Sequence, residues 1–294
     1  MTLSAYDAAN LFRETPHRLI DVGHGEVAYR CVGSGPDVLF VHGWPVSGAT
    51  FRCLLPYLTP NVTCHIIDMV GTGQSRFQRN PNISIDLHIK SVRSVVDALK
   101  LDNVALVGHN SGGMIARHAM VGDSRLRAMA LVNTEQPQGL NWRFRQFLSM
   151  SKFPGFMNLL AWAAMKPGLR KNKFLLGDCF IDRSLLNGEF EEFFLAPLQQ
   201  NLDLRWAAGQ LLRSFKESYV TELHEIHNRL NVPVQLVWGE QDPFFPIAWA
   251  KEMASTFPNT RLHVLPNAKL FVHEERPEEV SQAILPTLLG DHSN

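Results

Sequence analysis

The sequence lacks the features that mark membrane-spanning, nucleic-acid-binding and secreted proteins. Across 294 residues, 28 Lys and Arg balance 28 Asp and Glu, and there is neither a basic stripe nor a polybasic run. Charge therefore gives no indication of nucleic acid or a membrane surface as a partner. No apolar stretch reaches the roughly 18 residues needed to cross a bilayer. The first ten residues also lack the basic-then-apolar order of a signal peptide, so we expect a cytoplasmic protein.

Cysteine is scarce, and its spacing excludes the common cysteine-based sites. The four cysteines, Cys31, Cys53, Cys64 and Cys179, are scattered without CxxC spacing. We expect them to be reduced residues in or near the core, because neither a disulfide framework nor a zinc site has this pattern. The histidines show no metal-ligand spacing either. We therefore expect no metal and no cofactor.

Apolar residues make up 45% of the chain, which is enough for a sizeable core. Short apolar runs predict strands at 25–32, 37–41, 63–69, 104–108, 127–133, 232–239 and 260–265. Most runs are continuous, as in parallel strands that are buried on both faces. The alternating run 25–32 instead predicts an antiparallel edge strand.

Helical patterns separate these strands, except in one long segment. Helices are predicted at 85–99, 111–121 and 246–257, and a last one starts at Pro277. Residues 137–222 hold no convincing strand but ten of the 18 Phe residues. The predicted fold class is α/β, with a mostly parallel central sheet and an inserted helical cap. The core would comprise 1–136 and 223–294, and the cap 137–222.

Residues 104–114 have the outline of a nucleophile elbow, in which a strand, a sharp turn and a helix follow directly. The strained turn needs small residues two before and two after its tip. Gly108 and Gly112 meet this requirement only if the tip is Asn110. Ser111 fails it, because position 109 would then be His. The position expected to hold a nucleophile therefore holds a neutral amide.

Two further motifs accompany the elbow, and the three together resemble a known superfamily. They are His42-Gly-Trp-Pro45, Asp68-Met-Val-Gly-Thr-Gly-Gln-Ser75 and Gly108-His-Asn-Ser-Gly-Gly113. Because the three motifs occur in this order, the chain resembles the α/β-hydrolase fold superfamily over nearly its whole length. The branch containing epoxide hydrolases and haloalkane dehalogenases is most similar. In that branch an Asp at the tip attacks an sp3 carbon, and a His-activated water hydrolyses the resulting alkyl ester.

The amide at Asn110 conflicts with this chemistry, because it is a far poorer nucleophile than a carboxylate. We expect the chain as written to form the ester barely or not at all. Three explanations stay open: an Asp→Asn change that stalls the enzyme, a natural non-hydrolytic relative, or Ser111 acting as nucleophile. The first is favoured, since the Ser111 side chain would leave the turn in the wrong direction.

The resemblance also implies a general base and an acid that orients it. The family places a His in the loop after the last strand, and the usual spacing from Pro277 falls on Leu270. Either His273, the only His in that loop, is the base in a shifted register, or the base is absent. Asp242 is the expected acid, with Glu135 as the alternative.

The pocket would be formed at the same end of the sheet. Backbone N–H groups of Trp44 and Ser111 are the expected oxyanion or leaving-group donors. Trp44, His42 and Tyr219 are the expected substrate-binding side chains. Two departures limit the resemblance: the cap has one Tyr where epoxide hydrolases use two, and Ser111 stands where many dehalogenases have a halide-binding Trp.

The sequence as a whole predicts a hydrolase of a small, largely apolar substrate. Its mechanism would be of the Asp type, with epoxide or haloalkane hydrolysis through an alkyl-enzyme ester, inactivated here by Asn110. The alternatives are a catalytically silent small-molecule binder and an ester or lactone hydrolase that uses Ser111. The sequence gives no oligomeric state.

Overall fold

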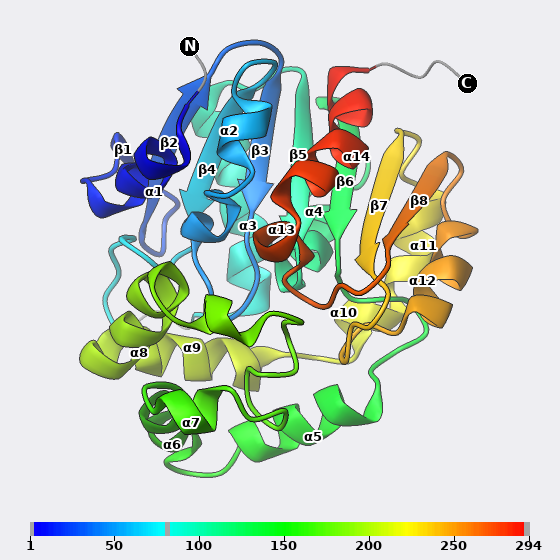
Figure 1. Ribbon diagram of the computed structural model, residues 1–294. Helices are drawn as coiled ribbons and strands as arrows, with labels where there is room; N and C mark the ends of the chain where they lie inside the picture. Colours follow the sequence, from blue (N-terminus) through cyan, green and yellow to red (C-terminus); the bar gives the residue numbers. More distant parts are fainter. Residues whose placement is uncertain (1–2, 80–82, 291–294) are drawn as a thin grey trace.

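One sheet of eight strands lies at the centre of the computed structural model, which describes residues 3–79 and 83–290 (Figure 1). Its strands are β1 (Arg18–Asp21), β2 (Glu26–Gly33), β3 (Asp37–Val41), β4 (Thr63–Asp68), β5 (Val104–His109), β6 (Leu126–Val132), β7 (Val234–Gly239) and β8 (Thr260–Leu265). Their order across the sheet is β1-β2-β4-β3-β5-β6-β7-β8. Strand β2 runs antiparallel to β1 and β4, and the other pairs are parallel.

The predicted strands all form, but the edge was predicted wrongly. Strand β2 is antiparallel as expected, yet it is not an edge strand, because β1 pairs with it from Arg18↔Tyr29 to Asp21↔Glu26. No sequence pattern predicts β1, because its four residues are too few to show a period.

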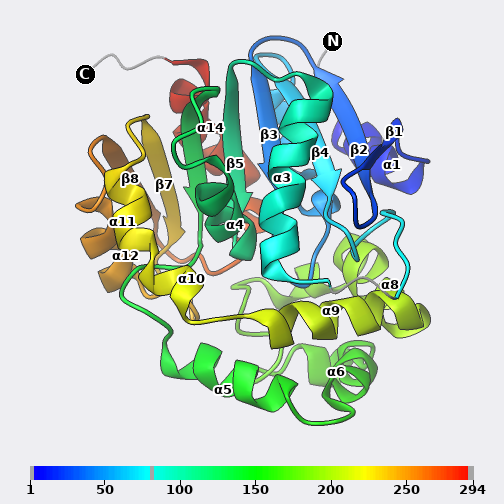
Figure 2. The same ribbon diagram turned by 180° about the vertical axis from the view of Figure 1, so that it is seen from behind.

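Helices cover both faces of the sheet. The described helices outside the segment between β6 and β7 are α1 (Ala5–Arg13), η1 (Gly48–Phe51), α2 (Leu55–Leu58), α3 (Ile85–Leu99), α4 (Ser111–Met120), α12 (Ile247–Ala254), α13 (Val272–Glu275) and α14 (Pro277–Leu289). Helices α2 and α14 lie on one face (Figure 1), and α3 and α4 lie on the other (Figure 2). Strands β5 and β7 are buried along their whole length, as their continuous apolar runs predict.

Apart from the isolated bridge Gln136↔Gly139, the described residues between β6 and β7 form no β-structure but several helices. These are α5 (Trp142–Ser151), α6 (Phe156–Ala164), α7 (Pro167–Arg170), η2 (Arg183–Leu186), η3 (Glu191–Leu195), α8 (Ala196–Gln200), α9 (Leu202–Ser214), α10 (Ser218–Thr221) and α11 (Leu223–Asn228). Elements α5 to α9, which we call the helical layer, lie beyond the carboxyl ends of the parallel strands (Figures 1 and 2). The cap boundaries 137 and 222 stay a prediction.

A buried carboxylate organises the loops between sheet and helical layer. Asp68, at the end of β4, accepts hydrogen bonds from the backbone N–H of Gly48 and Gln74, at 2.8 and 2.9 Å. Its buried counter-ion is Arg30 on β2, with 3.4 Å between Nη1 and Oδ2. The arrangement satisfies the charge and both backbone donors. It thereby fixes the loops after β3 and β4, which border the cavity described below.

The structure also bears on two of the expected absences. None of the described helices is long and apolar enough to cross a membrane. The four cysteines are all free, and Cys64 and Cys179 are buried.

Candidate active site

The turn between β5 and α4 has the geometry of the predicted elbow. Asn110 lies at its tip with φ 52° and ψ −138°, a conformation that L residues rarely adopt. A Cβ on Gly112 would lie 2.1 Å from the carbonyl oxygen of Val41, and one on Gly108 would lie 2.5 Å from Gly113 Cα. Both glycines are therefore required by close backbone approach, as the motif predicts.

Hydrogen bonds from the neighbouring strand hold this turn in place. The Asn110 N–H donates to the Asn133 carbonyl at 2.9 Å, and the Thr134 hydroxyl donates to the Asn110 carbonyl at 2.8 Å. The Asn110 side chain projects away from these contacts and lines a cavity. Its Oδ1 accepts a hydrogen bond from the Ser111 N–H. The strained tip is thus satisfied on its backbone and free to present an amide group.

The two backbone donors expected to face the reacting group are present, but side chains of the protein engage both. The Ser111 N–H donates to Asn110 Oδ1, and the Trp44 N–H donates to Ser111 Oγ at 3.2 Å. Trp44 precedes a cis peptide bond to Pro45. Its indole N–H donates to the Ala208 carbonyl on α9 at 3.0 Å, which ties the loop after β3 to the helical layer.

The cavity lies between the strand ends and the helical layer and has a volume of about 160 Å³. Its walls are mostly apolar side chains of the helical layer, including Phe147, Met157, Leu211 and Phe215. The polar groups cluster at the sheet end, where Asn110, Ser111 and Glu135 contribute to the lining. Such a cavity suits a small apolar molecule with one polar group.

Glu135 is the acidic side chain that lines this cavity, and it is almost completely buried. Its Oε2 lies 3.1 Å from the Thr134 hydroxyl, whereas Oε1 has no hydrogen-bond partner among the described residues. Burial raises the pKa of Glu135 to about 7, although the nearby Arg117 opposes this shift. Glu135 therefore changes charge near neutral pH.

Arg117 holds the backbone and side chain next to Glu135 in place. Its guanidinium donates to the Glu135 carbonyl at 2.7 Å and to the Thr134 hydroxyl at 3.0 Å, and it is fully buried. Burial lowers the pKa of Arg117 to about 9. The residue connects α4 to the loop after β6 and so fixes where Glu135 stands relative to Asn110.

Comparison with known proteins identifies the family. A profile of the alpha/beta hydrolase fold matches residues 36–277, well over half of the chain. The chain belongs to the α/β hydrolase fold family. This confirms the predicted fold class.

Individual relatives are distant. Haloalkane dehalogenase 2 of Mycobacterium tuberculosis is 25% identical over 280 residues, covering 91% of this chain and 93% of that protein. The human monoacylglycerol lipase ABHD6 is 24% identical, covering 89% and 77%. Among solved structures, a putative ancestral haloalkane dehalogenase has a TM-score of 0.79 at 20% identity, covering 94% and 100%. The epoxide hydrolase CorEH has a TM-score of 0.76 at 18% identity, covering 93% and 99%. The relatives of this α/β hydrolase therefore span several hydrolytic reactions.

The structure does not bring the predicted base to the cavity. His273 lies in α13, fully buried and outside the cavity lining, with Nε2 2.8 Å from Thr50 Oγ1 and its ring 4.2 Å from that of His109. Burial lowers the pKa of His273 well below its usual range, and His109 and Arg52 act in the same direction. These contacts give His273 a packing position instead of access to Asn110.

Leu270 instead lines the cavity, at the position that the usual family spacing selects. Its carbonyl lies 3.1 Å from His109 Nε2, which holds the loop in this register. Of the two readings that the sequence left open, the register without a shift fits the geometry. A residue with no proton-accepting group then occupies the place expected for the base.

The two candidate acids differ in what they contact. Asp242 is buried and accepts hydrogen bonds from the N–H groups of Phe244 and Phe245 at 2.7 and 3.0 Å and from the Asn133 amide. Burial raises its pKa to about 6. It lies outside the cavity lining and hydrogen-bonds to no imidazole among the described residues, whereas Glu135, the alternative, lines the cavity.

Of the predicted substrate-binding side chains, Trp44 and His42 line the cavity and Tyr219 does not. His42 accepts a hydrogen bond from the Met69 N–H at 2.9 Å, so its proton sits on Nδ1, 2.9 Å from the Gly43 carbonyl. Both nitrogens are therefore engaged in holding loops. Tyr219 is buried against His118 and Phe215, behind the cavity wall. Sequence spacing could not predict where Tyr219 points, because the residue lies in the short helix α10, which follows the helical layer in the chain.

No group of three or more His, Cys, Asp and Glu side chains within 3–79 and 83–290 is arranged to hold a metal ion.

The close approach at the elbow gives a stability prediction. Gly112→Ala should lower the free energy of unfolding by at least about 2 kcal/mol, because its Cβ would overlap the Val41 carbonyl, which is backbone and has little freedom to move. Gly168→Ala in α7 is the matched control, since no atom lies within 4 Å of its added Cβ. Denaturant unfolding of both variants measures the difference. Equal stability would contradict the elbow packing.

Burial of Glu135 gives a pH prediction. The pKa of Glu135 is about 7 in the folded protein and 4.5 for the free group, so the folded state binds the proton more tightly. Stability should therefore fall as the pH rises from 4.5 to 7, by up to about 3 kcal/mol. Glu135→Gln should remove this fall, becoming more stable than the parent at pH 8 but not at pH 4.5. Denaturant unfolding at both pH values measures it, with the exposed Glu240→Gln as control. A constant difference across pH would be the opposing result.

Proposed function

We propose that this α/β hydrolase binds a small, largely apolar molecule in the cavity and that its Asp-type hydrolytic cycle is blocked as the chain is written. The observation that carries the proposal is the pairing of Asn110 and Leu270 around one enclosed apolar cavity. In an Asp-type cycle, the first position must supply a carboxylate nucleophile and the second an imidazole base. An amide and an aliphatic side chain supply neither.

The blockage concerns both halves of the cycle. Displacement of halide or opening of an epoxide needs an oxygen nucleophile with negative charge, and the Asn110 amide is neutral. Hydrolysis of an ester needs a base that removes a proton from water. His42 and His88 both line the cavity. His42 uses both nitrogens for loop contacts, and His88 Nε2 lies 2.9 Å from the Val70 carbonyl. Binding, in contrast, needs only the apolar walls and the polar groups at the sheet end.

An ester hydrolase that uses Ser111 is less well supported. A serine nucleophile needs a base within hydrogen-bond reach. Ser111 Oγ accepts a hydrogen bond from the Trp44 N–H at 3.2 Å, and no imidazole among the described residues hydrogen-bonds to it. Glu135 hydrogen-bonds to Thr134 and not to Ser111, and its Oε1, which has no partner among the described residues, is available to position a ligand.

Restoring the two positions one at a time tests the proposal. With 1-haloalkanes, Asn110→Asp should release one halide per protein and gain the mass of the alkyl group, because the new carboxylate displaces halide but no base hydrolyses the ester. Asn110→Asp/Leu270→His should turn over, at least about 100-fold faster than the single variant, since general-base catalysis contributes roughly 10²–10⁴. Halide assays and intact-protein mass measure both steps.

Two controls complete the experiment. Asn110→Asp/Leu270→Asn introduces a polar group without a base and should still trap the ester. The protein as written should show no turnover but should be stabilised by the same haloalkanes, by about 2.7 kcal/mol at 100 times the dissociation constant. Turnover of any of these haloalkanes by the unsubstituted protein would contradict the blocked cycle. Absence of any ligand-induced stabilisation would contradict the binding function.

A further inference from the structure

The helical layer exposes most of the large apolar side chains that are exposed among the described residues. Ten of the thirteen large hydrophobic side chains that are exposed among the described residues lie between Trp142 and Leu202. We call five of them the outer patch; its members are Phe153, Leu159, Trp162, Leu169 and Phe174. Phe153 is 69% exposed and Phe174 is 78% exposed. Apolar groups concentrated in this way mark an interaction surface.

Helix α6 shows that the outer patch is a defined face. Met157, Ala161 and Ala164 are buried on its inner side, where α6 contacts α9. Leu159 and Trp162, three residues apart, point to the opposite side and are exposed. Helices α6 and α7 contact each other and lie at the end of the molecule farthest from the sheet (Figures 1 and 2).

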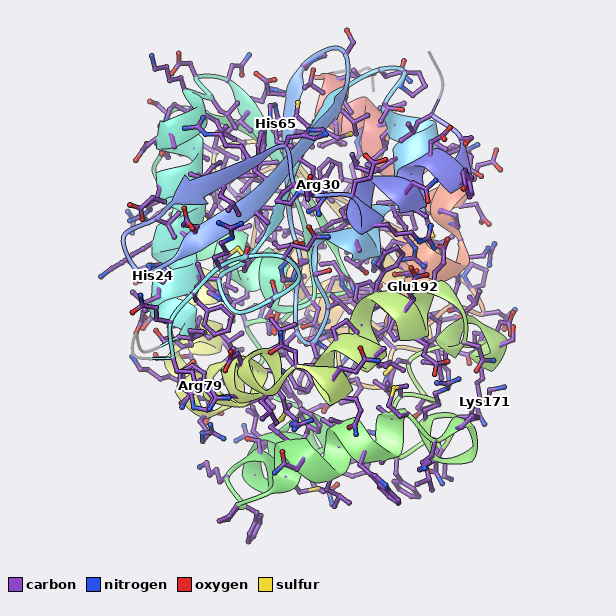
Figure 3. All side chains as sticks on the ribbon, turned by 90° about the vertical axis from the view of Figure 1, so that its left-hand side faces the viewer. His24, Arg30, His65, Arg79, Lys171 and Glu192 are labelled. Atoms are coloured by element: carbon purple, nitrogen blue, oxygen red, sulfur yellow. The ribbon has the colours of Figure 1, made fainter. Side chains whose placement is uncertain are left out.

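The same segment carries lysines that no described acidic side chain neutralises. Lys152, Lys166, Lys171 and Lys173 form no ion pair with any described residue. Lys171 projects from the right-hand side of the helical layer in Figure 3. Lys166 Nζ lies 5.8 Å from the ring centre of Trp162, and Lys173 Nζ lies 5.5 Å from that of Phe174.

We propose that the outer patch and its lysines dock on a lipid bilayer that contains anionic headgroups. Aromatic and aliphatic side chains insert at the level of the headgroups, while neighbouring lysines meet the negative surface. A second copy of this chain is a poor occupant, because two such faces would bring their unpaired lysines together. The sequence led us to expect no membrane partner, because these lysines never form a polybasic run. In the folded protein, Lys166 lies beside Trp162 and Lys173 beside Phe174.

The cavity and the outer patch share a residue. Phe174 belongs to the outer patch and also lines the cavity, together with Leu175 and Leu176. The buried side of α6 contributes Met157, Ala161 and Ala164 to the cavity wall. An apolar ligand dissolved in the bilayer would thus enter the cavity past Phe174 without crossing water. Docking itself does not depend on whether the site is catalytic.

Vesicle flotation tests the docking. The protein should float with vesicles of mixed phosphatidylcholine and phosphatidylglycerol but not with phosphatidylcholine alone, and added salt should weaken the binding. Lys166→Glu/Lys173→Glu should lower the partition coefficient onto these vesicles by at least about tenfold, since each lysine near an anionic surface contributes about 1 kcal/mol. Lys90→Glu/Lys251→Glu, which reverses two exposed lysines on the core, should leave binding unchanged.

A second pair of variants separates insertion from charge attraction. Phe153→Ser/Leu159→Ser alters the outer patch but no cavity-lining residue, and it should also reduce binding, whereas Tyr6→Ser on α1 should not. Tryptophan fluorescence should shift to shorter wavelength on vesicles, and Trp162→Phe should remove most of that shift. Unchanged thermal unfolding confirms that each variant is folded. Binding that depends neither on the lysines nor on the charge of the lipids would overturn the proposal. So would a lack of flotation, including the case in which light scattering shows a dimer that the same variants disrupt.

Discussion

The rest of the site depends on the close backbone contact between the elbow and the loop after β3. Gly112 at the start of α4 approaches the Val41 carbonyl so closely that no side chain fits between them. This contact places the tip of the turn, with its positive φ, against the strand ends and aims Asn110 into the cavity. Every other site residue takes its position relative to that tip. The strain is held because Asn133 and Thr134, directly after β6, hydrogen-bond to the backbone N–H and carbonyl of Asn110.

Next to the tip, charged side chains are buried at the polar end of an otherwise apolar cavity. Arg117 bridges α4 and the loop after β6, and Glu135 lines the cavity with one carboxyl oxygen that has no hydrogen-bond partner among the described residues. An unpaired buried oxygen is costly, so its retention at this place is typical of a functional group instead of a packing residue. His109 and His273, by contrast, pack together beneath the elbow with lowered pKa values, and they behave as neutral core residues.

The helical layer has two faces with different chemistry. Its inner face completes the cavity, and Trp44 anchors it to the core through Ala208. Its outer face combines exposed aromatic side chains with lysines, and Phe174 belongs to both faces. Because one thin layer forms both the cavity wall and the outer surface, a ligand and a membrane would contact the same few residues. The two proposals are therefore linked by structure, although each has its own test.

By itself the sequence determined the fold class, the tip of the elbow and the absence of a carboxylate there. These follow from local patterns: buried runs of strand length, helical spacing, and glycines two positions on either side of Asn110. The tertiary structure decided the rest. It placed Leu270 instead of His273 and Glu135 instead of Asp242 at the cavity, and it set Lys166 beside Trp162 and Lys173 beside Phe174. Those outcomes depend on which side of a loop or short helix faces inward, and that direction is set by packing between segments far apart in the chain.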